Sequence, residues 1–190
     1  VDNNEPENFK RINKIMLPKD YLIYSLTGVF ATDVSDASGM LLLDVKNRNY
    51  SKEMLDICHI EESNLPKLFE SYEVVGNLKD SIKNELGLKH DVKVIAGAGD
   101  NAAAAIGTGT VGNKACNISL GTSGTVFFSN DKFSVDKNNA LHSFCDASGN
   151  YHLMGCILSA ASCRKWWLED IIQDDDYLKD ESNLRDSDVI

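Results

Sequence analysis

The chain has 190 residues, of which 43% are hydrophobic and 25% charged, a composition typical of a globular protein with one large domain or two small ones. Its formal net charge of −10 argues against nucleic acid and anionic membrane surfaces as partners. No apolar run approaches the roughly 18 residues of a membrane span, and the polar, acidic residues 1–5 are not expected to act as a signal peptide.

The first half of the chain is predicted to alternate helices with extended segments. Apolar residues at helical spacing predict a helix over residues 18–26, which Thr27 and Gly28 would end. Residues 33–39 are short and polar, and they predict a loop that lacks the ligand register of a calcium site. The apolar run 92–96 predicts a strand in a sheet covered on both faces. Further short helices are predicted at 51–58, 63–68 and 78–86.

The pattern changes near residues 113–115, which read as a turn. From residue 116 the sequence predicts a strand, a turn, a second strand, a polar loop at 130–139 and a third strand. A helix is predicted to follow over 158–172. For the acid-rich residues 169–190, a solvated helix end and loop is favoured over a specific acidic binding tail.

The cysteines indicate a reducing compartment. Their number, five, is odd and none forms a CxxC pair, so reduced thiols in the cytoplasm are expected. A second group of residues raises the question of zinc, but its spacings match no standard pattern. We therefore expect Cys145 to be packed in a strand and Cys156 in a helix, and no metal site is assigned. The group consists of His142, Cys145, His152, Cys156 and Cys163.

Residues 94–107 combine a buried strand, a glycine turn, one carboxylate and a helix of small residues. At such a joint Asp100 can face a substrate, while the positive end of the helix keeps its carboxylate ionised. The alternative is that Asp100 only caps the helix, because Asp is favoured at that position for local reasons. For Asn101 alone, a residue at the helix start or in the turn is the simpler interpretation.

A second turn, Gly121-Thr122-Ser123-Gly124, lies between two apolar runs. It offers backbone amides and hydroxyls, which can surround the terminal oxygens of a phosphate. It is no Walker A loop, because no Gly-Lys-Ser/Thr follows, and similar turns join many hairpins. A carboxylate followed by a turn of this kind suggests phosphoryl transfer to an alcohol.

The same glycine turn also fits the G-x-G-x-x-A pattern of dinucleotide-binding domains, through Gly97, Gly99 and Ala102. That fingerprint needs an acid about twenty residues further on. Residues 116–123 contain neither Asp nor Glu, and Asp100 would itself repel a pyrophosphate docked in the turn. NAD binding is therefore not favoured.

Six segments of this chain, taken in order, resemble the FGGY family of carbohydrate kinases, and within it the members that phosphorylate D-xylulose. The resemblance runs from about residue 17 to about residue 167. Each segment is weakly specific by itself, whereas the ordered set is highly specific. The segments are Leu-Pro-Lys-Asp-Tyr-Leu, Leu-Thr-Gly, Thr-Asp-Val-Ser-Asp-Ala-Ser-Gly, Ala-Gly-Ala-Gly-Asp-Asn-Ala-Ala, Ser-Leu-Gly-Thr-Ser-Gly and Leu-His-Ser-Phe-Cys.

The resemblance implies an α/β fold of the actin-like ATPase type, in which two ribonuclease-H-like domains close over a cleft. It places a domain boundary near Gly112. Residues 1–112 would be the C-terminal part of the first, sugar-binding domain. Residues 113–190 would be the N-terminal part of the second, ATP-binding domain.

The resemblance also implies roles for individual residues. Asp100 matches the catalytic base of the family and Asn101 a contact to a sugar hydroxyl. Four consecutive residues match a loop that binds the phosphates of ATP, and Mg²⁺ is expected with the nucleotide. These residues are Gly121, Thr122, Ser123 and Gly124.

The implied activity is the ATP-dependent phosphorylation of D-xylulose to D-xylulose 5-phosphate. Because family members are well over twice this length, the chain resembles a central fragment, which is expected to be inactive by itself. Another pentulose or a sugar acid such as gluconate is the alternative acceptor. A sugar-binding protein without catalysis is the alternative from another class. Expected partners are the sugar and ATP, and a homodimer is left open.

Overall fold

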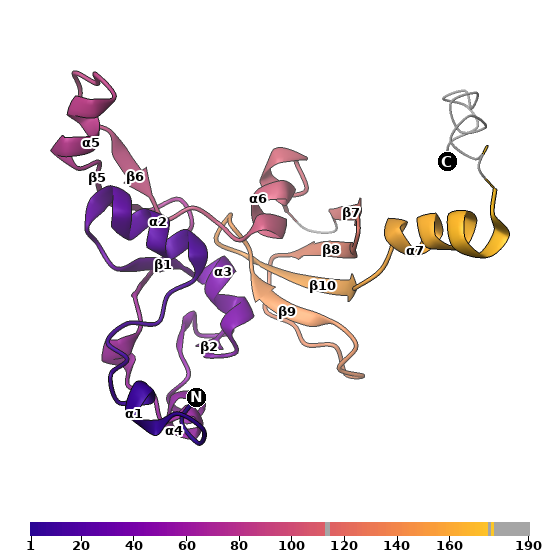
Figure 1. Ribbon diagram of the computed structural model, residues 1–190, viewed down its shortest axis with the longest axis horizontal. Coiled ribbons are helices and arrows are strands. Elements are labelled where there is room, and N and C mark those ends of the chain that lie inside the picture. The colour runs from indigo at the N-terminus through magenta and orange to yellow at the C-terminus, as the bar shows by residue number, and fades with distance from the viewer. Residues whose placement is uncertain (113–114, 175, 177–190) are drawn as a thin grey trace.

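The computed structural model describes residues 1–112, 115–174 and 176 (Figure 1). The first hundred residues form short helices and strands around small hydrophobic clusters. In chain order these elements are α1 (Pro6–Phe9), α2 (Pro18–Thr27), β1 (Ala31–Asp33), α3 (Val34–Ala37), the 3-10 turn η1 (Ser38–Met40), β2 (Leu43–Asp44), β3 (Asn49–Tyr50), α4 (Lys52–Cys58), the 3-10 turn η2 (Glu62–Asn64), β4 (Lys67–Phe69), β5 (Val74–Asn77), α5 (Asp80–Glu85) and β6 (Lys93–Ile95).

The rest of the described chain forms one helix, then a four-stranded antiparallel sheet and then a C-terminal helical segment. The strands of the sheet pair in the order β7-β8-β10-β9. Figure 1 shows this sheet beside α3 and α6, with α7 projecting away from it. No described helix is long and apolar enough to cross a membrane. The elements are α6 (Asp100–Gly107), β7 (Cys116–Leu120), β8 (Gly124–Asn130), β9 (His142–Cys145), β10 (Tyr151–Ile157), α7 (Ala161–Trp166) and the π-helical segment η3 (Trp167–Ile172).

Helix α2 confirms the helix predicted at 18–26. Pro18 occupies the first helical position, and the Asp20 carboxylate accepts the Leu17 N–H at 3.0 Å. The helix ends at Gly28, whose φ of 81° is left-handed and whose N–H donates to the Tyr24 carbonyl at 2.7 Å. Helices α4 and α5 likewise confirm the predictions at 51–58 and 78–86.

Asp33 ends β1 and residues 34–39 form a helical turn, so the prediction of a loop at 33–39 is wrong. The Asp33 side chain caps α3 by accepting the Ser35 N–H at 2.9 Å, and α3 continues into η1. The prediction of a helix at 63–68 is also wrong beyond the turn η2. There β4 pairs in parallel with β1, so tertiary pairing overrides the local helical signal.

The strand predicted at 92–96 exists as β6, but it is not covered on both faces. It pairs antiparallel with β5, and Ile95 is 52% exposed while Ala96 is buried. In the second half, β7 and β8 confirm the predicted strand-turn-strand. Two strands then follow where one was predicted, so Cys156 lies in β10 and not in a helix.

The additional strand arises from a tight turn after β9. The Asp146 carboxylate accepts the N–H groups of Ser148 and Asn150, both at 2.8 Å, and Gly149 has a left-handed φ of 93°. The predicted helix at 158–172 begins at Ala161 and continues into η3. Of the acid-rich residues 169–190, residues 169–172 form the exposed end of η3, as predicted for a solvated helix end. Residues 175 and 177–190 of that segment, and residues 113–114 of the predicted turn, lie outside the described residues.

The four-stranded sheet is anchored to the N-terminal elements through Cys145 at the end of β9. Its side chain is fully buried against Val34, Ala37 and Leu43, and its N–H donates to the Ser38 hydroxyl at 3.0 Å. Burial raises the pKa of this thiol, which fits an inert packing residue. The expected packing of Cys145 in a strand is confirmed.

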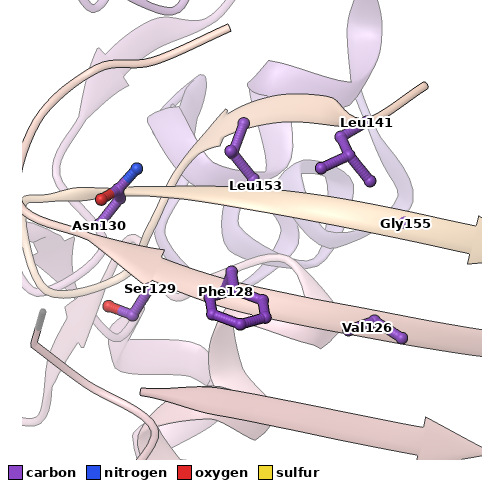
Figure 2. A pocket seen from close by; sticks show the side chains of 7 residues that line it. All are labelled: Val126, Phe128, Ser129, Asn130, Leu141, Leu153 and Gly155. Atoms are coloured by element: carbon purple, nitrogen blue, oxygen red, sulfur yellow. The ribbon is translucent and has the colours of Figure 1, made fainter. Parts of the chain in front are cut away.

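The two faces of the four-stranded sheet differ. Phe127 and His152 are buried on the face turned toward α3 and α6. The opposite face is apolar and open, with Phe128 50% exposed, and Figure 2 shows its side chains around a hollow of about 290 Å³. The hollow is lined by Val126, Phe128, Ser129, Asn130, Leu141, Leu153 and Gly155.

Candidate functional site

Asp100 and Asn101 line a small pocket of about 150 Å³ between α3, α6 and the covered face of the four-stranded sheet. Polar groups come from the start of each helix, and the sheet contributes aromatic and apolar side chains. The pocket residues are Ser35, Asp36, Gly39, Gly99, Asp100, Asn101, Ala102, Phe144, His152 and Met154. Two of the predicted site residues therefore share one pocket with Asp36, a second carboxylate that the sequence did not single out.

Asp100 is the first residue of α6, and Gly99 occupies the N-cap position. The interpretation of Asp100 as a helix cap is therefore wrong. One carboxylate oxygen accepts the Asn101 N–H at 2.7 Å and the Asn101 side-chain amide at 3.1 Å. The side chain is exposed, so the other oxygen can receive a proton from a bound molecule. Asn101 lies at the helix start, as expected.

Asn101 connects the pocket to the glycine turn. Its side-chain oxygen accepts a hydrogen bond from the Thr125 hydroxyl at 3.0 Å. Thr125 directly follows Gly124, the last residue of the predicted phosphate loop. One side-chain hydrogen bond therefore connects the end of this loop to Asn101, the residue after Asp100. The structure thus brings together two motifs that lie about twenty residues apart in the sequence.

The Gly121–Gly124 turn joins β7 to β8, and its carbonyl groups are tied down. The Gly121 carbonyl accepts the Ala161 N–H and the Thr122 carbonyl accepts the Ala160 N–H, both at 2.9 Å. Gly124 is needed for this contact, because a Cβ there would lie 2.9 Å from the Cβ of Ala160. The start of α7 therefore holds the turn in one orientation.

The N–H and hydroxyl donors of the turn do not take part in its contacts with α7. The Gly121 N–H donates within the turn, to the Ser123 carbonyl at 2.9 Å. The N–H groups and hydroxyls of Thr122 and Ser123 have no hydrogen-bond acceptor within residues 1–112, 115–174 and 176, and both residues are exposed. Free amides and hydroxyls on a rigid turn fit the oxygens of a phosphate.

Beneath the pocket lies a buried charged cluster that centres on Lys19. Its ammonium group lies 2.9 Å from the Asp33 carboxylate and 3.4 Å from that of Asp20, and both carboxylates are fully buried. It also donates to the Ala96 carbonyl at 3.0 Å and lies 4.0 Å from Asp36. Burial raises the pKa of Asp36, and Lys19 opposes this effect.

Ser35 connects this cluster to the pocket. The Ser35 hydroxyl donates to Asp33 at 2.5 Å and accepts the Gly99 N–H at 3.0 Å. Sequence reasoning missed Lys19, Asp33 and Ser35 as site residues. All three lie within segments that carry the family resemblance, and this resemblance was the one sign that they could belong to the site. Neither their residue types nor their spacing connects them with Asp100.

His152 forms part of the pocket wall. Its ring stacks on Phe127 with centroids 4.0 Å apart and meets Phe144 edge-on at 5.4 Å. Burial lowers the pKa of His152 to about 4, so the ring is neutral at pH 7. Among the described residues, no group of three or more His, Cys, Asp or Glu side chains has the arrangement of a metal site.

Comparison with known proteins identifies what this chain is similar to. Residues 1–107 match a model described as the FGGY family of carbohydrate kinases, N-terminal domain. The chain is 44% identical over 167 residues to the xylulose kinase of Escherichia coli (strain K12), an alignment that covers 87% of this chain and 34% of that protein.

Solved structures agree with the sequence comparison. The xyloylose kinase of Brucella ovis matches 96% of this chain and 38% of its own length, with a TM-score of 0.90 and 40% identity. The gluconate kinase of Lactobacillus acidophilus matches 97% of this chain and 38% of its own, with a TM-score of 0.86 and 27% identity. The predicted actin-like ATPase fold is confirmed for the part that this chain contains. The chain spans about a third of the length of these relatives.

Proposed function

Because the chain belongs to the FGGY family of carbohydrate kinases, we propose that the full-length protein phosphorylates D-xylulose to D-xylulose 5-phosphate with ATP. The observation that carries this proposal is the hydrogen bond between Asn101 and Thr125. It links the residue that follows the exposed Asp100 to the residue that follows the Gly121–Gly124 turn. This contact supports a proton acceptor at Asp100 and a phosphate site at the turn, close to each other.

Asp100 is proposed as the catalytic base. In phosphoryl transfer the bond to the leaving ADP is largely broken before the new bond forms, so alignment of the attacking hydroxyl matters as much as its deprotonation. The free carboxylate oxygen of Asp100 would accept the proton of the sugar C5 hydroxyl, while the C5 oxygen bonds to the γ-phosphorus and the bond from phosphorus to ADP breaks. Asn101 holds the other carboxylate oxygen and would contact a sugar hydroxyl.

The Gly121–Gly124 turn is proposed to bind the terminal phosphate of ATP. The amides and hydroxyls of Thr122 and Ser123 would donate to the phosphate oxygens, while α7 keeps the carbonyls turned away. Mg²⁺ bound with the nucleotide would offset the phosphate charge. Its protein ligands are proposed to lie outside this chain.

We place a domain boundary near Gly112, with residues 1–112 on the sugar side and 113–190 on the ATP side. The contact between Asn101 and Thr125 would then cross between the two domains. Closure of the domains would exclude water and limit wasteful hydrolysis of ATP. A cytoplasmic location is proposed because the five cysteines are free thiols. A homodimer stays a prediction.

The acceptor is tested by ADP release from Mg·ATP with the full-length protein. D-xylulose, other ketoses, glycerol and gluconate are compared as acceptors, and D-xylulose is expected to give the largest kcat/KM. A preference for gluconate would favour the second candidate, which the similarity to a gluconate kinase supports. Sugar binding without sugar-stimulated ADP release would instead indicate a binding protein on a kinase fold.

A further inference from the structure

The turn that carries Asp100 is fastened at both ends to the buried cluster around Lys19. At the strand end, the Lys19 ammonium group donates to the Ala96 carbonyl at 3.0 Å. At the helix end, the Ser35 hydroxyl accepts the Gly99 N–H at 3.0 Å. Two short contacts from one cluster therefore bracket the residues between β6 and α6.

The orientation of the Ser35 hydroxyl is set by the group beneath it. A serine hydroxyl has one proton to donate, and here it goes to the buried carboxylate of Asp33 at 2.5 Å. The same carboxylate oxygen accepts from Ser71 at 2.8 Å, and Lys19 balances its charge. The hydroxyl therefore presents a lone pair to Gly99 in a fixed direction.

Gly99 determines where Asp100 points, because it is the N-cap residue directly before it. Helix α6 has no side-chain cap of its own, and the Ser35 hydroxyl, from another helix, accepts the N–H of its N-cap residue. The approach is close, since a Cβ on Gly99 would lie 3.3 Å from the Cα of Asp36. Without the Ser35 hydroxyl, the Gly99 N–H would lose this hydrogen-bond acceptor at a point where the backbone is closely packed against Asp36.

We propose that Ser35, oriented by Asp33, is a positioning residue that fixes Asp100 toward the acceptor hydroxyl by holding the Gly99 N–H. The inference rests on the proposed function, because Asp100 has to act on an acceptor for its direction to matter. Ser35 lines the same pocket as Asp100, but it is not assigned a contact with the phosphoryl group. A small displacement of a catalytic group is enough to slow a reaction about a hundredfold.

The chain supplies a matched control in Ser38, one turn further along. Its hydroxyl is also buried, donates to the Val34 carbonyl at 2.7 Å and accepts a backbone N–H, that of Cys145, at 3.0 Å. Ser38→Ala therefore removes the same kind of hydrogen bonds from the same helical segment without touching Gly99.

The test uses the full-length protein with Ser35→Ala, Ser35→Thr and Ser38→Ala. For Ser35→Ala we expect kcat with D-xylulose to fall about ten- to a hundredfold, with both KM values within about twofold of the wild type. Ser38→Ala is expected to keep kcat within about threefold, and Ser35→Thr, which retains the hydroxyl, to recover most of the loss. Hydrogen exchange of the peptide that contains Gly99 should accelerate in Ser35→Ala and not in Ser38→Ala.

The outcomes separate this inference from the proposed function. If the wild type shows no sugar-stimulated ADP release, the proposed function fails and the role of Ser35 in it fails as well. If the wild type is active but Ser35→Ala loses no more kcat than Ser38→Ala, only the positioning role is overturned. Unchanged hydrogen exchange around Gly99 in a folded Ser35→Ala protein would overturn the contact on which that role depends.

Discussion

His152 is almost fully buried between Phe127 and Phe144, on the sheet side of the pocket. Burial lowers its pKa to about 4 from an ordinary 6.5. The unfolded chain therefore binds more protons at this site than the folded one between those two pH values. Stability contributed by the neutral ring is present above about pH 6.5 and is lost as the pH falls toward 4.

We predict that acidification from pH 7 to pH 4 costs the wild type up to about 3 kcal/mol through this residue alone. In His152→Phe that part of the pH dependence should be absent, because phenylalanine keeps the stacking on Phe127 but does not titrate. Chemical unfolding at several pH values measures both proteins. Equal pH dependence in the two would show that His152 is not held neutral by burial.

Helix α6 is attached to the four-stranded sheet near each of its ends. Asn101 in its first turn accepts from Thr125 of β8 at 3.0 Å. Thr108, which follows its last residue, accepts from the Asn117 side chain of β7 at 3.2 Å. Both contacts pair a threonine hydroxyl with an asparagine side chain, the hydroxyl donating at Thr125 and accepting at Thr108. Only the Thr125 contact lies next to Asp100, and the other is more than a helical turn away.

Thr125→Val and Thr108→Val compare these two attachments. Each removes a hydroxyl and is expected to lower the free energy of unfolding by about 1 kcal/mol. Thr125→Val should also lower kcat/KM for the sugar severalfold, because Asn101 loses the donor that orients its side chain. Thermal unfolding and ADP release measure these effects. A similar loss of kcat/KM in both variants would remove the special role of the Asn101 contact.

Sequence patterns correctly predicted the elements that are stabilised by residues close to them in the sequence. Proline at the start and glycine at the end marked α2, and the Gly-Thr-Ser-Gly turn marked the hairpin of β7 and β8. The strand β4 was missed because its partner β1 lies 36 residues earlier, a pairing that no local pattern encodes. The helix α3 was missed because the residues that cap it also suit a polar loop.

The same distinction holds for the candidate site. Asp100 and the Gly121–Gly124 turn are predicted from residue type and spacing together with the family resemblance, and the role of Asn101 from the resemblance alone. The supporting residues Lys19, Ser35 and Ser71 come from three separate segments. Their common function is visible only when Asp33 and the turn before Asp100 are placed next to them, which depends on tertiary structure.

At the scale of the whole molecule, the four-stranded sheet is covered on one face, where Phe127 and His152 are buried, and open on the other. Ile118, Val126 and Phe128 are each at least 40% exposed on the open face. Contiguous apolar surface of this kind favours association in water.

Residues 1–190 expressed alone are therefore predicted to self-associate and to bind a hydrophobic dye. Phe128→Ser, in the centre of the open face, should reduce both effects. Ile57→Ser replaces a side chain that is 64% exposed on α4 and should leave them unchanged. Sedimentation velocity and dye fluorescence measure the outcome. A monomer with a cooperative unfolding transition would contradict this account of the open face.

The proposed role of Asp100 as the base of a sugar kinase is tested most directly by D-xylulose-dependent ADP release. The full-length protein is measured as the wild type, as Asp100→Ala and as Asp56→Ala, a control on the exposed side of α4. We expect activity in the wild type and the control, with kcat lowered about a hundred- to ten-thousandfold in Asp100→Ala. Full activity of a folded Asp100→Ala protein would contradict this role.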